Sequence, residues 1–209
     1  MSHNHSAIDG DVTQGWATYY AKVGLGPPRP TMLHALDRLA ADGTARGGHA
    51  VDLGCGVGRD ALELLRRGWR VTAVDQEPDA LAGLLAEAAA RGLPAPEPVR
   101  SRFEVVELPR CELVNSSFAL FFCPPDAFPG LWRRIRAALF PGGRFAGHLL
   151  GPNDTWAAKP EVAAHGAAEL ASLLSGWSVE RLEREETDSV TPRGEAKRWD
   201  IWHLVLRRP

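Results

Sequence analysis

The chain has 209 residues, a formal net charge of −2 and 44% hydrophobic residues. This length suits one domain with a substantial buried core, and the nearly balanced charge provides no global basic field to recruit nucleic acid. No apolar stretch has transmembrane length, and the polar start MSHNHSAIDGD lacks the apolar core of a signal peptide, so we expect a cytoplasmic protein without membrane contact.

The three cysteines, Cys55, Cys111 and Cys123, are scattered and show no C-x-x-C spacing. This odd number and this spacing argue against a disulfide framework and against a structural zinc site. We therefore expect no bound metal.

Aromatic residues gather near the N-terminus, where WATYYAKVG carries Trp16, Tyr19 and Tyr20. We predict a short helix or helical lid over Thr13–Lys22, within an N-terminal tail of residues 1–30. The proline-rich stretch 24–30 excludes helix. The next segment, Thr31–Ala41, has apolar residues at helical spacing.

Residues 49–75 follow the pattern of a strand, a loop, a helix and a second strand. An apolar run, His49–Leu53, leads into three alternating glycines at positions 54, 56 and 58. An amphipathic segment follows, with leucines on one side, and it ends at Gly68. Its opposite side carries the charged residues Arg59, Asp60, Glu63, Arg66 and Arg67. A second apolar run, Val71–Val74, ends in Asp75.

This unit indicates a ligand that contains a ribose. A glycine-rich loop lets the backbone approach a ligand closely, and an acid at the tip of the second strand can accept hydrogen bonds from ribose hydroxyls. The spacing is G-x-G-x-G rather than the dinucleotide G-x-G-x-x-G, and Asp52 precedes the first glycine by two residues. That carboxylate would repel a pyrophosphate, but it could accept a hydrogen bond from an ammonium group.

The rest of the chain continues the alternation of helices and strands. We predict helices in residues 76–92, Leu131–Leu139 and Pro160–Leu174. Residues Val99–Leu108 are predicted to form the third strand and its following turn, and further strands are predicted at Glu112–Phe118, Arg144–Leu150, Ser178–Glu186 and Lys197–Arg208. The last two strands form an antiparallel hairpin, because no helix-length connection separates them. The predicted fourth strand lies beside the first.

The run DLGCGVG followed by VTAVD resembles motif I and the following acidic position of class I S-adenosylmethionine-dependent methyltransferases. From Val51 to Trp156 the chain is most similar to the small tellurite-resistance-type and related small-molecule methyltransferases. The resemblance implies a Rossmann-like α/β fold in one domain, residues 1–209. Its seven-stranded, mostly parallel sheet has an antiparallel last strand and helices on both faces.

The resemblance also implies S-adenosylmethionine as cofactor and a set of residues that bind it. The motif and the strand ends supply Asp52, Gly54, Cys55, Gly56, Gly58, Asp75, Gln76, Phe103, Glu104 and Asn115. An apolar ring at 103 could pack on adenine, and a carboxylate at 104 could accept from its amino group. The alternative is that Phe103 belongs to the core and Glu104 to the surface.

The methyl acceptor is expected to be a small molecule. Candidate acceptor-binding residues are Trp16, Arg29, Ser116, Ser117, Phe118 and Trp156. Candidate bases or orienting groups are Tyr19, Tyr20 and His148, with His203 inside the last predicted strand as a further candidate. His148 could equally be a hydrogen-bonded buried histidine, and the residues after the fourth strand could be a plain polar loop. No N-P-P-[YF] or D-P-P-Y tetrapeptide follows that strand, which disfavours methylation of DNA bases or of protein glutamine.

Two alternatives to a small-molecule enzyme stay open. The first is a methyltransferase acting on RNA or protein, with an arginine patch at 66, 67, 133, 134 and 136, although the net charge makes a nucleic-acid partner the weaker expectation. The second is a non-catalytic module that binds S-adenosylmethionine. The sequence carries no signal for an oligomeric state.

Overall fold

The computed structural model describes residues 25–44, 47–190 and 196–209. The predicted helix at Thr13–Lys22 and the candidates Trp16, Tyr19 and Tyr20 lie outside these ranges. None of the described helices combines the length and the apolar character needed to cross a bilayer.

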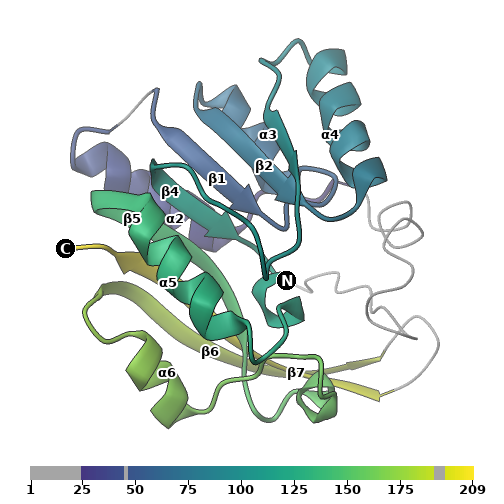
Figure 1. The fold of residues 1–209 in the computed structure, drawn as a ribbon, viewed down its shortest axis with the longest axis vertical. Coiled ribbons are helices and arrows are strands. Elements are labelled where there is room, and N and C mark those ends of the chain that lie inside the picture. Colours follow the sequence, from purple (N-terminus) through teal and green to yellow (C-terminus); the bar gives the residue numbers. More distant parts are fainter. Residues whose placement is uncertain (1–24, 45–46, 191–195) are drawn as a thin grey trace.

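Seven strands form one sheet in the order β3-β2-β1-β4-β5-β7-β6 (Figure 1). The strands are β1 His49–Leu53, β2 Arg70–Asp75, β3 Glu97–Arg100, β4 Cys111–Ser116, β5 Leu139–Leu150, β6 Ser178–Val190 and β7 Ala196–Arg207. Strand β7 is antiparallel to both of its neighbours, and the other pairings are parallel. The predicted seven-stranded sheet with an antiparallel last strand is therefore confirmed, and β4 lies beside β1 as expected.

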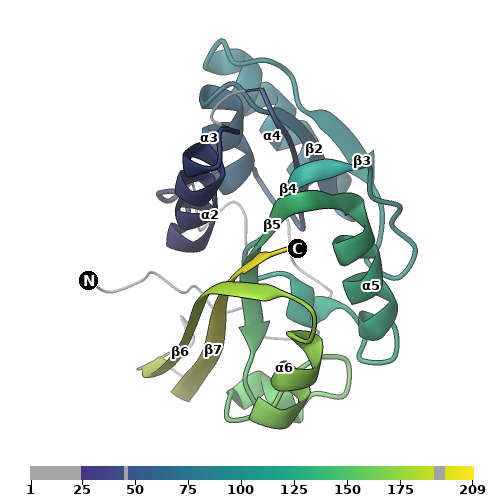
Figure 2. The same cartoon turned by 90° about the vertical axis from the view of Figure 1, so that its left-hand side faces the viewer.

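Helices cover both faces of the sheet (Figure 2). The helices are α2 Pro30–Ala41, α3 Arg59–Arg66, α4 Pro78–Ala90, α5 Phe128–Ala138 and α6 Ala167–Leu173. Apolar side chains of α2, α3 and α4 share one buried cluster with the sheet, and those of α5 and α6 share the other. Successive side chains of a strand point to opposite faces, so each buried strand contributes to both clusters. This explains why all five residues of β1 are buried.

Residues 99–108 hold the end of a strand and a turn, as predicted: β3 ends at Arg100, and residues 103–105 form a turn. One predicted element is shorter in the structure. The helix predicted at Pro160–Leu174 covers only Ala167–Leu173. Residues 160–162 form a turn and a bend, and the backbone after them is extended, because Ala163 N donates to Phe121 O and His165 N donates to Leu150 O. These bonds to distant segments replace the helical ones that the local apolar spacing suggested.

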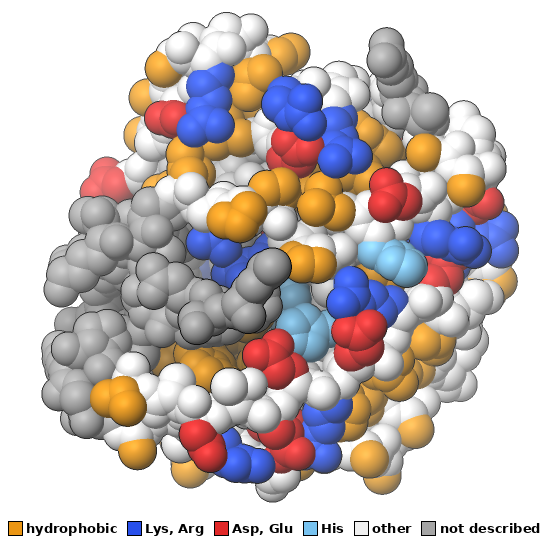
Figure 3. Space-filling model, turned by 180° about the vertical axis from the view of Figure 1, so that it is seen from behind, with side chains coloured by type: hydrophobic (Ala, Val, Ile, Leu, Met, Phe, Trp, Pro, Cys, Tyr) orange, Lys and Arg blue, Asp and Glu red, His pale blue; other side chains and the backbone are white. Residues whose placement is uncertain are grey.

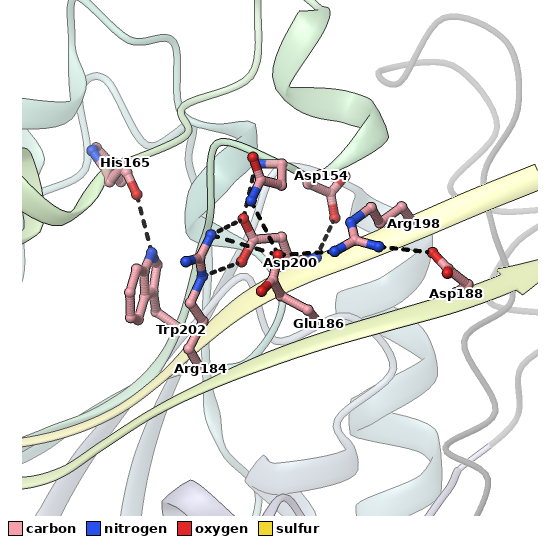
Figure 4. Close-up of polar contacts among 9 residues, drawn as sticks. Asp154, His165, Arg184, Glu186, Asp188, Arg198, Asp200 and Trp202 are labelled. Atoms are coloured by element: carbon pink, nitrogen blue, oxygen red, sulfur yellow. Dashed lines mark hydrogen bonds and ion pairs between the residues drawn. The ribbon is translucent and has the colours of Figure 1, made fainter.

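The parallel strands end at one edge of the sheet, here called the carboxyl edge (Figure 1). A buried ionic network holds the loop after β5 to β7 there (Figure 4). Asp200 accepts two hydrogen bonds from Arg184, both of 2.8 Å, and one from Asn153 N. Asp154 accepts from Lys197 and from the backbone N–H of Asp200. The loop 151–158 is therefore fixed by paired charges rather than by apolar packing alone.

Candidate functional site

The glycine loop between β1 and α3 has a backbone that only glycine adopts easily. Gly54, Gly56 and Gly58 have positive φ values of 75°, 53° and 93°. A Cβ at Gly54 would lie 2.4 Å from Ala119 Cβ, and a Cβ at Gly58 would lie 2.3 Å from Leu84 Cδ1. Both distances are too short for real contacts, so Ala119 and Leu84 leave no room for a side chain at these two glycines. Without a side chain, the backbone of the partly exposed Gly54 can approach a ligand closely.

Asp75 ends β2 beside this loop. Its Oδ2 accepts a hydrogen bond of 2.8 Å from Gly56 N, and its Oδ1 accepts one of 3.0 Å from Glu77 N. These bonds fix the carboxylate against the glycine loop. Each carboxylate oxygen has two lone pairs, so Asp75 can accept further hydrogen bonds from a ligand. Gln76 follows it and is partly buried.

Two buried carboxyls and an amide meet at the ends of β1 and β4. Asp52 and Asn115 are register partners, and Asn115 Nδ2 donates to Asp52 Oδ1 at 2.8 Å and to Asp60 Oδ2 at 3.0 Å. All three side chains are buried. Burial and the nearby Asp60 carboxylate raise the pKa of Asp52 to about 8.

Two oxygens of this cluster are left for a ligand. Asp52 Oδ2 and Asn115 Oδ1 have no hydrogen-bond partner within the described ranges, although both atoms are buried. An unsatisfied buried oxygen is costly, and a cationic donor such as an ammonium group would satisfy both. The arrangement therefore fits the positively charged, amino-acid-like group that the sequence suggested.

Asp60 is a residue that sequence reasoning placed incorrectly. The helical pattern assigned it to the solvent side of α3, but it is buried. It accepts from Ser117 Oγ at 2.6 Å and from Arg29 N at 2.8 Å, besides Asn115. The available signal was its place in the first turn of a helix directly after the glycines, where a carboxylate is favoured by the helix dipole.

Phe103 and Cys55 border the glycine loop. The Phe103 ring lies beside Gly54, with its Cζ 3.2 Å from where a Cβ would stand. Its carbonyl oxygen and that of Glu104 accept hydrogen bonds from Arg134, and the Glu104 side chain pairs with Arg102. Cys55 is buried, and burial raises the pKa of its thiol. Phe103 therefore packs against the core and also lies beside the glycine loop.

The segment after β4 holds the residues predicted to face the acceptor. Ser116 is buried, and its Oγ donates to Leu53 O. Phe118 has a φ of 55° and is the one described non-glycine residue with positive φ. Its ring lies between the Arg29 guanidinium, 4.3 Å from the ring centroid, and His148, with centroids 4.1 Å apart. Arg29, Ser117, Phe118 and His148 are thus brought together.

Trp156 lies in a neighbouring aromatic cluster rather than beside His148. It packs against Phe122 and Trp199, with ring centroids 5.9 and 5.2 Å apart. Phe118 packs against the edge of the same cluster. Trp156 therefore reaches the acceptor region only through this apolar layer.

A cavity of about 420 Å³ lies at the opposite edge of the sheet. The end of α2, residues 140–143 at the start of β5 and the side chains of Arg144 and Arg207 line it. Arg144 is already paired with Asp42 and Glu180. This cavity shares no residue with the polar cluster at the carboxyl edge.

Comparisons with known proteins agree with this geometry. A family described as a methyltransferase domain matches residues 50–143. The carboxy-S-adenosyl-L-methionine synthase of Dichelobacter nodosus is 30% identical over 171 residues, which cover 78% of this chain and 72% of the relative. The chain belongs to the class I S-adenosylmethionine-dependent methyltransferases. It is a methyltransferase, and S-adenosylmethionine is its methyl donor.

Solved methyltransferase structures share its fold. TehB from Haemophilus influenzae superposes with a TM-score of 0.70 at 16% identity over 83% of this chain. This chain spans only 62% of the length of TehB. The magnesium protoporphyrin IX methyltransferase of Synechocystis, solved with S-adenosylmethionine bound, gives a TM-score of 0.64 at 16% identity and covers 92% of both chains.

Proposed function

We propose that this methyltransferase acts on a small-molecule acceptor bound at the carboxyl edge of β1, β4 and β5. The donor part of the proposal rests on the polar cluster there, whose buried oxygens on Asp52 and Asn115 have no hydrogen-bond partner within the described ranges. The acceptor part rests on the Phe118–His148 stack beside that cluster. Ser117 joins this cluster to the wall formed by Phe118 and His148. The Synechocystis relative, named for a porphyrin acceptor, is consistent with a small acceptor.

The residues fit the methyl donor in three parts. Asp52 and Asn115 would hold its ammonium group, and Asp75 would accept from the ribose hydroxyls. The glycine loop would lie along the connecting atoms, bordered by Cys55 and Gln76. Phe103 would pack on the adenine, and Glu104 would accept from its amino group. The bound sulfonium supplies an electrophilic methyl group.

The chain's own contribution to catalysis is to place the acceptor. Holding a nucleophile in line with the methyl carbon can remove roughly 7–11 kcal/mol from the barrier. Arg29, Ser116, Ser117, Phe118 and Trp156 are proposed to shape the acceptor site, together with Trp16. His148, Tyr19 and Tyr20 are proposed to orient the acceptor.

Calorimetric titration tests donor binding. We expect S-adenosylhomocysteine to bind one-to-one, whereas NADH should not bind. Asp75→Ala should lose this binding because the ribose loses its acceptor, and Asp79→Ala, which removes an exposed acid on α4, should keep it. Unchanged affinity in Asp75→Ala would contradict the assignment of the ribose site.

The product identifies the acceptor class. Incubation with S-adenosylmethionine and a metabolite pool should release S-adenosylhomocysteine together with a methylated small molecule, both detected by mass spectrometry. Methylated protein or RNA in a lysate, with no methylated metabolite, would contradict the small-molecule proposal. A carboxylated form of the donor would instead match the activity for which the Dichelobacter relative is named.

A further inference from the structure

Two histidines face each other on β5 and β7 near the carboxyl edge. His148 and His203 are direct partners in the antiparallel register, and their rings meet edge to face with centroids 4.9 Å apart. Strand alternation places both on the sheet face that α2 covers. Figure 3 shows histidines among acidic and basic side chains on this side of the molecule. His148 is buried, whereas the His203 side chain is 17% exposed.

Glu185 of β6 determines which ring nitrogen of His203 carries the hydrogen. Its Oε2 lies 3.0 Å from His203 Nε2. A carboxylate only accepts, so Nε2 carries the hydrogen and Nδ1 presents a lone pair. Within the described ranges no hydrogen bond reaches this Nδ1. His49, by contrast, uses both ring nitrogens, with Nδ1 at 3.1 Å from Arg110 O and Nε2 at 2.8 Å from Thr72 Oγ1.

The surroundings of His203 keep its imidazole neutral. Burial lowers the pKa of His203 more than the Glu185 carboxylate raises it. On β6, Arg181 also lowers this pKa and Glu183 raises it; β5 contributes His148, and α2 contributes His34, which interacts with Glu183. A neutral imidazole is the form that accepts a proton at neutral pH.

The histidine pair adjoins the proposed acceptor wall. Ser116 and Gly147 are register partners, so His148 stands level with the residues that follow β4. Phe118 stacks on His148 and approaches His203 edge-on, with centroids 6.5 Å apart. The left-handed backbone of Phe118 is a strained conformation of the kind that gathers at functional sites.

We propose that His203, oriented by Glu185, is the base that receives the acceptor's proton, and that the acceptor is therefore a hydroxyl or amine rather than a ready-made anion. This inference rests on the proposed function. The acceptor's lone pair forms the bond to the methyl carbon, the electron pair of the S–CH₃ bond stays on sulfur, and the acceptor's proton passes to His203 Nδ1.

Nitrogen NMR of the full chain tests the base without any turnover. At pH 7 we expect the His203 ring to be neutral with its hydrogen on Nε2, assigned by the signals missing from His203→Gln. Glu185→Gln should lower the pKa of His203, because the carboxylate that raises it is lost. A hydrogen on Nδ1, or a charged ring at pH 7, would overturn the proposal.

A pair of phenols tests the chemistry. With 4-methylphenol, which is un-ionised at neutral pH, His203→Gln should slow S-adenosylhomocysteine release by about 100-fold or more. With 4-nitrophenolate, already ionised at pH 8, the loss should be under about threefold because no base is needed. His34→Gln is the matched control on α2. Equal losses with both phenols, or no loss with either, would show a merely structural histidine.

Two further results separate failure of this inference from failure of the proposed function. If S-adenosylhomocysteine binds wild type and His203→Gln equally, the donor site stands and the phenol results decide the role of His203. If wild type fails to bind it, the proposed function itself fails. If neither phenol is methylated, the nitrogen NMR result, which locates the hydrogen on the His203 ring, decides whether the proposal stands.

Discussion

The affinity for S-adenosylhomocysteine should rise steeply between pH 6 and pH 8 because of Asp52. Burial and Asp60 raise the pKa of this carboxyl to about 8, so the protonated form predominates at neutral pH. The ligand's ammonium group needs the carboxylate. The deprotonated fraction is about 1% at pH 6 and about 50% at pH 8, and apparent affinity scales with the competent fraction. We expect roughly a 50-fold gain over this range.

Calorimetry at pH 6, 7 and 8 measures this gain. The matched ligand is 5′-methylthioadenosine, which keeps the adenosine but lacks the ammonium group, so its affinity should not change with pH. Asp52→Asn should flatten the profile for S-adenosylhomocysteine and weaken binding most at pH 8, where the wild type has gained most. A flat wild-type profile would refute the reasoning, as would an equal rise for 5′-methylthioadenosine.

Two further predictions concern packing and buried charge. Gly54→Ala should cost about 2–4 kcal/mol of unfolding free energy, measured by urea denaturation, because of its positive φ and because of overpacking. The new Cβ would stand 2.4 Å from that of Ala119, so adding Ala119→Gly should recover only the part of the cost that comes from overpacking. Full recovery of the unfolding free energy would exclude backbone strain. Lys197→Met leaves Asp154 buried without its cation, so it should cost about 3–5 kcal/mol and lower Tm by roughly 6–20 °C in calorimetry. Lys159→Met, which removes a cation not paired with Asp154, is the control, and similar Tm values for the two variants would argue against a stabilising role of the buried pair.

The central unit was predictable because its signals are local. The glycine spacing, the apolar runs and the acid at the strand tip lie within residues 49–75, and β1 has the predicted bounds His49–Leu53. Each strand is buried on both faces by helices that the sequence also indicates. The periodicity therefore predicted the strand–loop–helix–strand unit and located the glycine loop and Asp75 without knowledge of distant contacts, whereas the fold class followed from the family resemblance of the motif.

The rest of the site depends on contacts between distant segments. Asp60 is buried because Asn115 and Ser117 reach it from β4, and a helical pattern cannot show such partners. The neighbours of His203 depend on the strand register, which sets it opposite His148 and near Glu185. The extended stretch before α6 was misassigned for the same reason.

The ionic network at the start of β7 and the glycine loop anchor separate halves of the sheet. Strands β1 and β2 carry the glycine loop and Asp75, whereas the loop after β5 is held to β7 by Asp154, Lys197 and Asp200. Neither anchor shares a residue with the other. Changes in the loop after β5 are therefore not expected to disturb the glycine loop, so under the proposed function one scaffold can be adapted to new acceptors.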